Sequence, residues 1–367
     1  MTKCCSVLSL ALVLCLFPPV LPADETPPVR IGIAGLVHDH VHGILNQLAR
    51  PGAVEIVGIA EQNPAVVARF KEQYSIPEKL LFKDLESLIA ETKPSAVMAF
   101  TSTFDHKKIV EDCAPHGVHV MMEKPLAVSV EHGKAMADLA EKHDVHLMVN
   151  YETTWYRSNH AAFDLVREQK AIGEIRKMVV MDGHEGPVEI GCSEAFLAWL
   201  TDPVLNGGGA LTDFGCYGAN LMTWLMGDAR PISVSAVTQQ IKPDVYPRVD
   251  DEATIVLTYP RAQAIIQASW NWPFNRKDME VYGRTGYAHT AGHYGVRLKT
   301  DSGPEKLVRS PARKAPHDRE TSYLAAVVRG ELQPEGLSSL KNNLIVTEIL
   351  EAARESAGTG KVVSLSP

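Results

Sequence analysis

The stretch VRIGIAGLVHDHVHGIL, residues 29–45, decides the architecture of the first half of the chain. Its apolar run predicts a buried strand over 29–34, followed by Gly35 and then a helix. Further apolar runs at 55–60, 96–101, 118–122 and 146–150 alternate with amphipathic stretches at 64–74, 85–92, 106–116 and 130–143. Alternation at this spacing predicts an α/β domain with a parallel, doubly wound sheet over residues 29–150.

The regular alternation of strand-like and helix-like stretches ends at about Trp155. A long helix, a strand near 175–181 and a glycine-rich loop with a helix precede several short strands, expected at 232–238, 252–259, 264–270 and 278–282. Their β-branched and aromatic residues, separated by Pro, Gly and Asp turns, are typical of an open, mainly antiparallel sheet. Residues 151–367 are therefore expected to form an α+β domain for substrate binding and oligomerisation. Its C-terminal helices, at 319–329 and 340–356, are expected to pack back on the first domain.

The composition is that of a globular protein, with 367 residues, 45% hydrophobic and 22% charged, which favours two domains. The net charge is −8 and no run of Lys and Arg is present, so nucleic acid is not an expected partner. Three cysteines follow the first 23 residues, an odd number that predicts neither a disulfide framework nor a cysteine metal site.

The first 23 residues have the layout of a Sec-type signal peptide, with Lys3, an apolar run over 4–17, three prolines and Ala23 as the cleavage point. The prediction is an exported, periplasmic protein that does not contact the membrane once the leader is removed. An uncleaved anchor fits less well, because the apolar run is shorter than the ~20 residues that a bilayer requires. A lipoprotein signal also fits less well, because a large Leu precedes Cys15.

Gly35 stands where a dinucleotide-binding Rossmann turn places a pyrophosphate over a helix N-terminus. Val37 and His40 replace the second and third glycines of the usual G-x-G-x-x-G, so side chains there must force a wider turn. Glu61 ends the second strand, where an acid usually binds a ribose hydroxyl, and no Arg follows in Gln62-Asn63. The prediction is NAD as cofactor, with NADP possible.

The same turn holds His38, His40 and His42. On a helix, His38 and His42 would share a face, and such a group can bind a metal. No second ligand cluster stands out, so no metal is predicted. Contact of His38 and His40 with the cofactor phosphates or the substrate is the favoured interpretation, and a surface position is the alternative.

Lys124 directly follows the strand at 118–122, at the carboxyl edge of the parallel sheet where such folds bind ligands. Asp213 and Tyr217 stand four residues apart on one face of the helix after the glycine-rich loop. Oxidation of an alcohol by hydride transfer requires a base, and a Tyr can serve if a nearby Lys lowers its pKa. We predict Tyr217 as this base, Lys124 as its neighbour and Asp213 as the group that orients the substrate hydroxyl.

Together these motifs resemble the Gfo/Idh/MocA oxidoreductases, which include glucose-fructose oxidoreductase, inositol dehydrogenase and dihydrodiol dehydrogenase. The resemblance covers about residues 29–365 and is carried by IGIAG at 31–35, EKP at 123–125, GGGALTDFGCY at 207–217, DEA at 251–253 and ASW at 268–270. It implies that Lys124 and Asp213 line the nicotinamide and that Tyr217 is the acid/base. It also implies cofactor contacts at Thr101, His106 and Glu123, although Ser102 and Thr103 replace the Pro and Asn of the family's T-P-N-x-x-H stretch.

The predicted activity is NAD(P)-dependent oxidation of a CH–OH group of a sugar, cyclitol or glycoside. Free cofactor is scarce outside the cytoplasm, so a tightly bound, internally recycled cofactor is expected. The alternatives are a redox-neutral NAD-dependent glycosidase of the same family and a binding protein without catalysis. An open sheet with one uncovered face favours a homodimer or tetramer. Aromatic faces suit sugar rings, and the candidate substrate residues are Tyr156, Arg157, His184 and Trp272.

Overall fold

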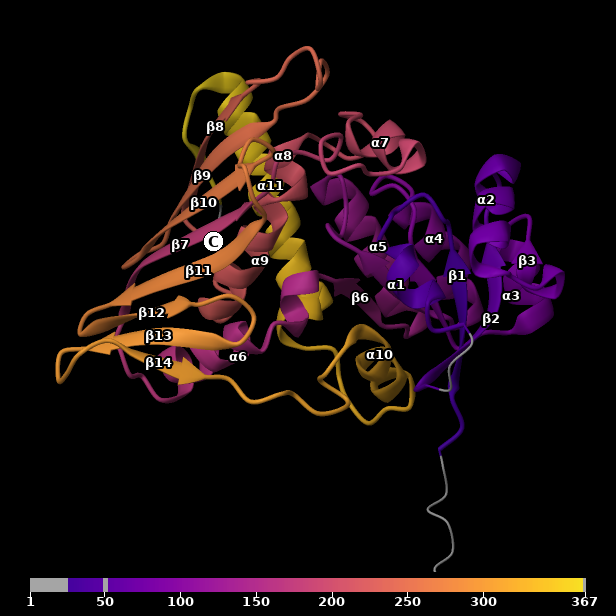
Figure 1. The fold of residues 1–367 in the computed structure, drawn as a ribbon, viewed down its shortest axis with the longest axis horizontal. Coiled ribbons are helices and arrows are strands. Elements are labelled where there is room, and N and C mark those ends of the chain that lie inside the picture. Colours follow the sequence, from indigo (N-terminus) through magenta and orange to yellow (C-terminus); the bar gives the residue numbers. More distant parts are fainter. Residues whose placement is uncertain (1–25, 49–51, 366–367) are drawn as a thin grey trace, which may run out of the picture.

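The computed structural model describes residues 26–48 and 52–365, so the predicted leader at 1–23 lies outside the described residues. Two sheets, each with its own helices, organise this part of the chain (Figure 1). Within these ranges, no helix combines the length and apolar character that crossing a bilayer requires.

The first sheet is parallel throughout and has the strand order β3-β2-β1-β4-β5-β6. The strands are β1 (Val29–Ala34), β2 (Val54–Ala60), β3 (Leu81–Phe82), β4 (Ala96–Ala99), β5 (His119–Glu123) and β6 (Leu147–Asn150). The predicted doubly wound, Rossmann-type sheet is confirmed. Its order reverses between β1 and β4, and such folds bind ligands outside the carboxyl ends of the strands at this point.

The helices of this domain are α1 (Val41–Leu45), α2 (Pro64–Tyr74), α3 (Leu85–Thr92), α4 (His106–Cys113) and α5 (Val130–His143). Side chains of Asn63, Asp84 and Ser129 accept backbone N–H groups at the starts of α2, α3 and α5, which explains where those helices begin. Helix α1 is short because the histidine-rich segment before it forms a turn.

The second sheet has nine strands in the order β14-β13-β12-β11-β7-β10-β9-β8-β15, and only β7 and β10 pair in parallel. The predicted open, mainly antiparallel sheet is therefore confirmed. Its strands are β7 (Ile175–Gly183), β8 (Ser233–Gln239), β9 (Glu252–Thr258), β10 (Gln263–Ser269), β11 (Arg276–Gly283), β12 (Gly286–Thr290), β13 (Gly295–Thr300), β14 (Lys306–Arg309) and β15 (Val363–Ser364).

The remaining helices follow the first sheet in the chain. They are α6 (Arg157–Phe163), which continues as a π-helical turn over Asp164–Glu168, α7 (Glu194–Leu200), α8 (Ala210–Asp213), α9 (Gly215–Leu225), α10 (Glu320–Val328) and α11 (Leu340–Thr359). Short 3-10 turns lie at Glu78–Leu80, Ala114–His116, Glu152–Trp155 and Gly336–Ser338. Helices α9 and α11 cover one face of the second sheet, and α11 also contacts α5 and β6 of the first domain (Figure 1). Helix α10 shares a core with β1.

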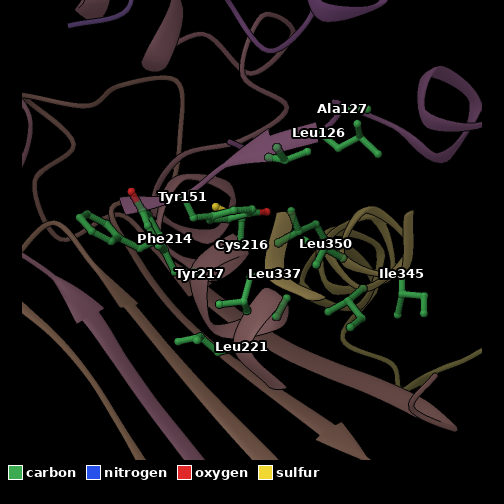
Figure 2. Packing of buried hydrophobic residues seen from close by; sticks show 14 of the residues in the cluster. Leu126, Ala127, Tyr151, Phe214, Cys216, Tyr217, Leu221, Leu337, Ile345 and Leu350 are labelled. Atoms are coloured by element: carbon green, nitrogen blue, oxygen red, sulfur yellow. The ribbon is translucent and has the colours of Figure 1, made fainter. Parts of the chain in front are cut away.

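A continuous apolar core crosses the junction between the two sheets. Figure 2 shows Tyr151 and Leu126, from the end of the first domain, gathered with Phe214, Cys216 and Tyr217 of the glycine-rich segment. Because this core joins the sheets, it fixes the carboxyl edge of the first sheet against the face of the second.

Candidate active site

An ion pair between Lys124 and Asp213 links the two sheets. Lys124 follows β5, Asp213 ends α8, and the Lys124 ammonium binds the Asp213 Oδ1 atom and lies 3.3 Å from its backbone carbonyl oxygen. Burial raises the pKa of Asp213, but the Lys124 ammonium outweighs this effect and holds the pKa below its usual value. The indole Nε1 of Trp270 donates to the other carboxylate oxygen at 2.9 Å. Each oxygen thus has one side-chain partner in the protein, and Asp213 holds Lys124 in place.

The segment that carries Asp213 and Tyr217 is two helices, not the single helix that the sequence predicted. Helix α8 ends at Asp213, α9 begins at Gly215, and the Tyr217 N–H donates to the Phe214 carbonyl, three residues earlier, at 3.2 Å. The carboxylate of Asp250 fixes the start of α8 by accepting the N–H groups of Gly209 and Leu211 at 2.9 and 2.7 Å. Despite the break, the Lys124 ammonium lies 5.2 Å from the centre of the Tyr217 ring.

Tyr217 is only 2% exposed. Burial raises its pKa well above the usual value for a tyrosine, and the carboxylates of Glu152 and Asp213 raise it further. The lowering of the Tyr217 pKa expected from Lys124 is therefore outweighed by burial in this structure. In this state of the protein Tyr217 keeps its proton, which is the form that a general acid requires.

A second lysine, which sequence reasoning missed, lies beside Tyr217. The Lys277 ammonium on β11 is 4.7 Å from the centre of the Tyr217 ring and is paired with Glu152. Burial raises the pKa of Glu152, but Lys277 outweighs this effect and lowers that pKa to about 2. The sequence did carry a sign of this position. Lys277 lies two and four residues before the buried residues Met279 and Val281, so it shares their inward face of the strand.

Asp182 on β7 stands opposite Lys277 in the backbone register of β7 and its neighbouring strand β11. It is fully buried, and neither carboxylate oxygen has a hydrogen-bond partner among the described residues. Burial raises its pKa well above the usual value for a carboxyl group, so folding favours the protonated form. Sequence reasoning missed Asp182 because nothing in a buried strand pattern marks which residues lack a partner.

The four predicted substrate residues differ in how near they lie to the group around Lys124, Tyr217 and Lys277. The Tyr156 hydroxyl donates to Glu152 and so joins the Lys277 pair. His184 packs edge-on against Phe214 with ring centres 4.9 Å apart, and burial lowers its pKa. Trp272 packs against Gly183, where a Cβ would come within 2.8 Å of the indole. Arg157 instead lies over the Tyr294 ring at 4.4 Å, so the structure does not bring it to the Lys124 group.

A groove of about 440 Å³ at the carboxyl edge of the first sheet includes Gly35, Val37, Glu61 and Thr101 among its lining residues. Gly35 has φ +79°, and a Cβ there would meet the Thr101 methyl at 2.6 Å, so a glycine is required. Glu61 accepts the backbone N–H of Leu36 at 2.8 Å and thereby braces the turn. These features fit the adenosine half of a dinucleotide, with Val37 where a glycine usually allows close approach of phosphate.

His106 is placed differently from the groove residues. It is 1% exposed, and its Nδ1 donates to the Leu126 carbonyl at 3.1 Å. Burial lowers its pKa, so the ring is neutral near pH 7. His106 therefore braces the loop that follows Lys124 through Nδ1, and its predicted contact with the cofactor stays a prediction.

The expectation that His38 and His42 share one helix face is wrong. His38 precedes α1 and His42 lies within it, so the two rings do not share one helix face. His42 contacts the Tyr74 hydroxyl of α2. His40 instead reaches β5, where its Nδ1 lies 2.9 Å from Glu123 Oε2. His40 and Glu123 also line a second pocket, of about 360 Å³, whose other residues are Asp39, Gly43, Ile44, Met98, Phe100, Asn150, Glu152, Trp155 and Glu320.

Comparison with known protein families gives two adjacent matches. Residues 29–151 match the model described as "Oxidoreductase family, NAD-binding Rossmann fold" of the GFO_IDH_MocA group, and residues 161–289 match the "GFO/IDH/MocA C-terminal domain". Together these ranges cover more than half of the chain.

Individual proteins are similar over most of their length. D-apiose dehydrogenase from Rhizobium rhizogenes is 25% identical over 336 residues, which are 84% of this chain and 90% of that protein. Trans-1,2-dihydrobenzene-1,2-diol dehydrogenase from Mus musculus is 24% identical over 346 residues, 90% of this chain and 97% of that protein. The crystal structure of aldose-aldose oxidoreductase from Caulobacter crescentus superposes with a TM-score of 0.78 at 24% identity and covers 92% of this chain and 100% of that one. This likeness of structure shows a shared fold.

Proposed function

The chain belongs to the Gfo/Idh/MocA family of oxidoreductases, with an NAD-binding Rossmann domain, and from this premise we propose that it oxidises or reduces a CH–OH/C=O group of a neutral sugar or cyclitol. The observation that carries the proposal is the meeting of Lys124, Asp213 and Tyr217 at the carboxyl edge of the first sheet. This is where a Rossmann fold presents the reactive end of its cofactor. The nicotinamide, when bound, supplies or accepts the hydride.

The adenosine half of the cofactor is assigned to the groove of about 440 Å³. Its lining includes the acids Glu61, Asp84, Glu86, Asp105 and Asp112 but only two lysines, Lys83 and Lys108. Lys108 is itself paired with Asp112. A groove with this excess of carboxylates disfavours a 2′-phosphate, which supports NAD over NADP.

Proton transfer is assigned to Tyr217. In reduction, the protonated phenol donates to the oxygen of the new alcohol. In oxidation, the phenolate takes the hydroxyl proton, and the ammonium groups of Lys124 and Lys277 stabilise the negative charge that develops. Asp213 acts indirectly, by holding the Lys124 ammonium beside the ring.

The pocket of about 360 Å³ is the proposed substrate site. It adjoins the catalytic group through Glu123, next to Lys124 in the chain, and through Glu152, which binds Lys277. Its carboxylates, from Asp39, Glu123, Glu152 and Glu320, repel an anionic substrate and accept hydrogen bonds from hydroxyl groups. Trp155 supplies an aromatic wall. This lining is the reason for proposing a neutral polyhydroxyl compound rather than a sugar acid or phosphate.

Export and assembly are part of the same proposal. The leader-like segment at 1–23 supports a periplasmic location, and the scarcity of free cofactor there supports a bound, recycled dinucleotide. The uncovered face of the second sheet carries Val237, 70% exposed, and Tyr282, 38% exposed. Outward-facing apolar residues on an open sheet support a homodimer or tetramer that covers this face.

The test begins with protein purified from its native compartment. Denaturation followed by mass spectrometry of the released small molecules should yield NAD(H), and a panel of neutral sugars and cyclitols should then change nicotinamide absorbance or give oxidised and reduced sugar pairs. Protein that neither carries nor binds NAD(P)(H) would overturn the proposal in favour of a binding protein. Aryl glycosides distinguish net oxidation from redox-neutral cleavage of a glycosidic bond. Release of the aryl group without a net carbonyl product would indicate a redox-neutral glycosidase instead.

A further inference from the structure

Three side chains of metal-ligand type converge where the histidine-rich turn meets β5. His38, His40 and Glu123 each offer one ligand atom, and these atoms lie within 4.8 Å of one another. Two of the three come from one turn, but the third is far away in the sequence and arrives only because β1 and β5 flank β4 in the sheet. The sequence alone predicts no metal here because it shows no second ligand cluster, and the fold brings Glu123 to the histidines as the third ligand.

We propose that His38, His40 and Glu123 bind one divalent transition-metal ion of the zinc class. Two imidazoles and one carboxylate are a ligand set of catalytic zinc sites, which keep a fourth position open. Imidazole nitrogens favour zinc and its neighbours, whereas calcium and magnesium prefer sites built from oxygen atoms. The ligand chemistry therefore selects a zinc-class ion rather than an alkaline-earth ion.

The surroundings of these residues support a built site. His38 is 1% exposed, and its Nε2 has no hydrogen-bond partner among the described residues. Its Nδ1 accepts the His40 backbone N–H at 3.2 Å, which places the proton of the neutral ring on Nε2, so coordination through Nε2 requires the other tautomer and the loss of this contact. Phe196 and Trp199 of α7 pack against the His38 ring with centres 4.7 and 5.4 Å away. An apolar wall of this kind limits solvent access to a bound ion.

A hydrogen bond from a neighbouring side chain fixes the orientation of the Glu123 carboxylate. Its Oε1 accepts the Asn150 side-chain amide at 2.7 Å, while Oε2 contacts His40 Nδ1 at 2.9 Å. An ion about 2.0–2.2 Å from each donor would replace the direct contact between His40 and Glu123. The His40 side chain is 41% exposed and so is free to move the short distance that this requires.

The open position of the ion would be accessible from the substrate pocket, because His40 and Glu123 both line it. The neighbouring acids Asp39 and Glu320 favour a cation there, and the nearby Lys124 and Lys277 ammonium groups are neutralised by Asp213 and Glu152. An oxygen of a bound polyol is the chemical group that would complete the coordination. This inference goes beyond the proposed hydride transfer, which does not require a metal.

The experiment uses the whole protein, stripped with a chelator and titrated with Zn²⁺ against a chromophoric competitor. We expect one tightly bound ion per chain, and Co²⁺ in its place should give the visible absorption of a four-coordinate site. His40→Ala should weaken zinc binding by more than the 10–100-fold that loss of an outer-shell partner costs. His42→Ala is the matched control, because His42 lies in the same segment but contacts Tyr74, and its zinc affinity should equal that of the wild type.

Two results would overturn the inference. One is wild-type protein that binds no zinc under these conditions, and the other is a His40→Ala variant that binds zinc as tightly as the wild type. NADH binding, followed by its fluorescence in the metal-free protein, separates this outcome from failure of the proposed function. Protein that carries or binds NAD(H) but binds no zinc disproves the metal site alone, whereas protein that binds zinc but neither carries nor binds NAD(H) disproves the proposed oxidoreductase.

Discussion

The Lys277 ammonium lies 4.7 Å from the centre of the Tyr217 ring, slightly closer than the Lys124 ammonium at 5.2 Å. The two lysines come from different sheets, and each is paired with its own carboxylate, Glu152 and Asp213 respectively. A cation beside a phenol stabilises its ionised form. Two ammonium groups thus lie beside the Tyr217 ring, of which the sequence indicated one, and we expect both to favour its ionised form.

Replacing Lys277 tests this arrangement. In Lys277→Met, the pKa of Tyr217 should rise, so the pH at which kcat for oxidation reaches its plateau should move upward and kcat near neutral pH should fall. Lys277→Arg should restore part of the wild-type pH profile because it keeps the charge. The control is Lys177→Met, since Lys177 on β7 is bonded to Gln263 at the surface. A pH profile of Lys277→Met identical to that of the wild type would remove Lys277 from the proton chemistry.

Tyr217→Phe tests the acid/base assignment itself. Because only the hydroxyl is lost, NADH binding should stay near the wild-type value while kcat falls by roughly 10²-fold or more, the usual size of a general acid/base contribution. Steady-state kinetics and NADH fluorescence titration give the two quantities separately. Wild-type turnover in this variant would exclude the assignment.

Gly35→Ala tests the cofactor turn. A Cβ at Gly35 would meet the Thr101 methyl at 2.6 Å and the Phe100 carbonyl oxygen at 2.9 Å, and φ is +79°. We expect destabilisation of at least about 1–2 kcal/mol from the left-handed backbone alone, together with weaker NADH binding. The control is Gly43→Ala in α1, where a Cβ would meet nothing within 4 Å. Equal NADH affinity in both variants would contradict the placement of the cofactor.

Trp270→Phe tests the support of Asp213. The indole donates to Asp213 Oδ2 at 2.9 Å in a fully buried position. Its loss should lower the free energy of unfolding by about 1.5–3 kcal/mol, the value of a hydrogen bond to a charged group. Denaturant unfolding measures this change. Trp272→Phe is the comparison, because that ring is only half-buried, and a similar loss in both variants would mean that ring volume rather than the hydrogen bond is responsible.

Asp182→Asn gives a stability change that depends on pH. The pKa of Asp182 in the folded protein is raised by burial, so folding favours its protonated form. This favourable contribution is complete below the unfolded pKa of about 4 and is lost as the pH rises toward the folded pKa. The Asn variant, neutral throughout, should therefore gain stability relative to the wild type between pH 4 and pH 7. Denaturant unfolding at both pH values that shows a constant difference would contradict a raised pKa.

Much of the fold followed from local patterns. The strand at 29–34 and the helices at 64–74, 85–92 and 130–143 have the bounds that periodicity predicted, because buried runs and N-cap residues are encoded locally. Strand β3, with two residues, carries too little pattern to be detected. The break of the helix at Phe214 was also missed, although Asp213 and Gly215 on either side of it have low helix propensity.

The sequence by itself determined the two-sheet architecture, because that rests on a repeating local pattern. It also indicated the dinucleotide turn at Gly35 and, through the family resemblance, the choice of Lys124, Asp213 and Tyr217, which stay predictions. Only the tertiary structure decided what these residues meet. Register between β7 and β11 sets Lys277 opposite Asp182, and the order of strands in the first sheet brings Glu123 to His40. Such pairs depend on strand order and packing over long separations, for which the local sequence carries no signal.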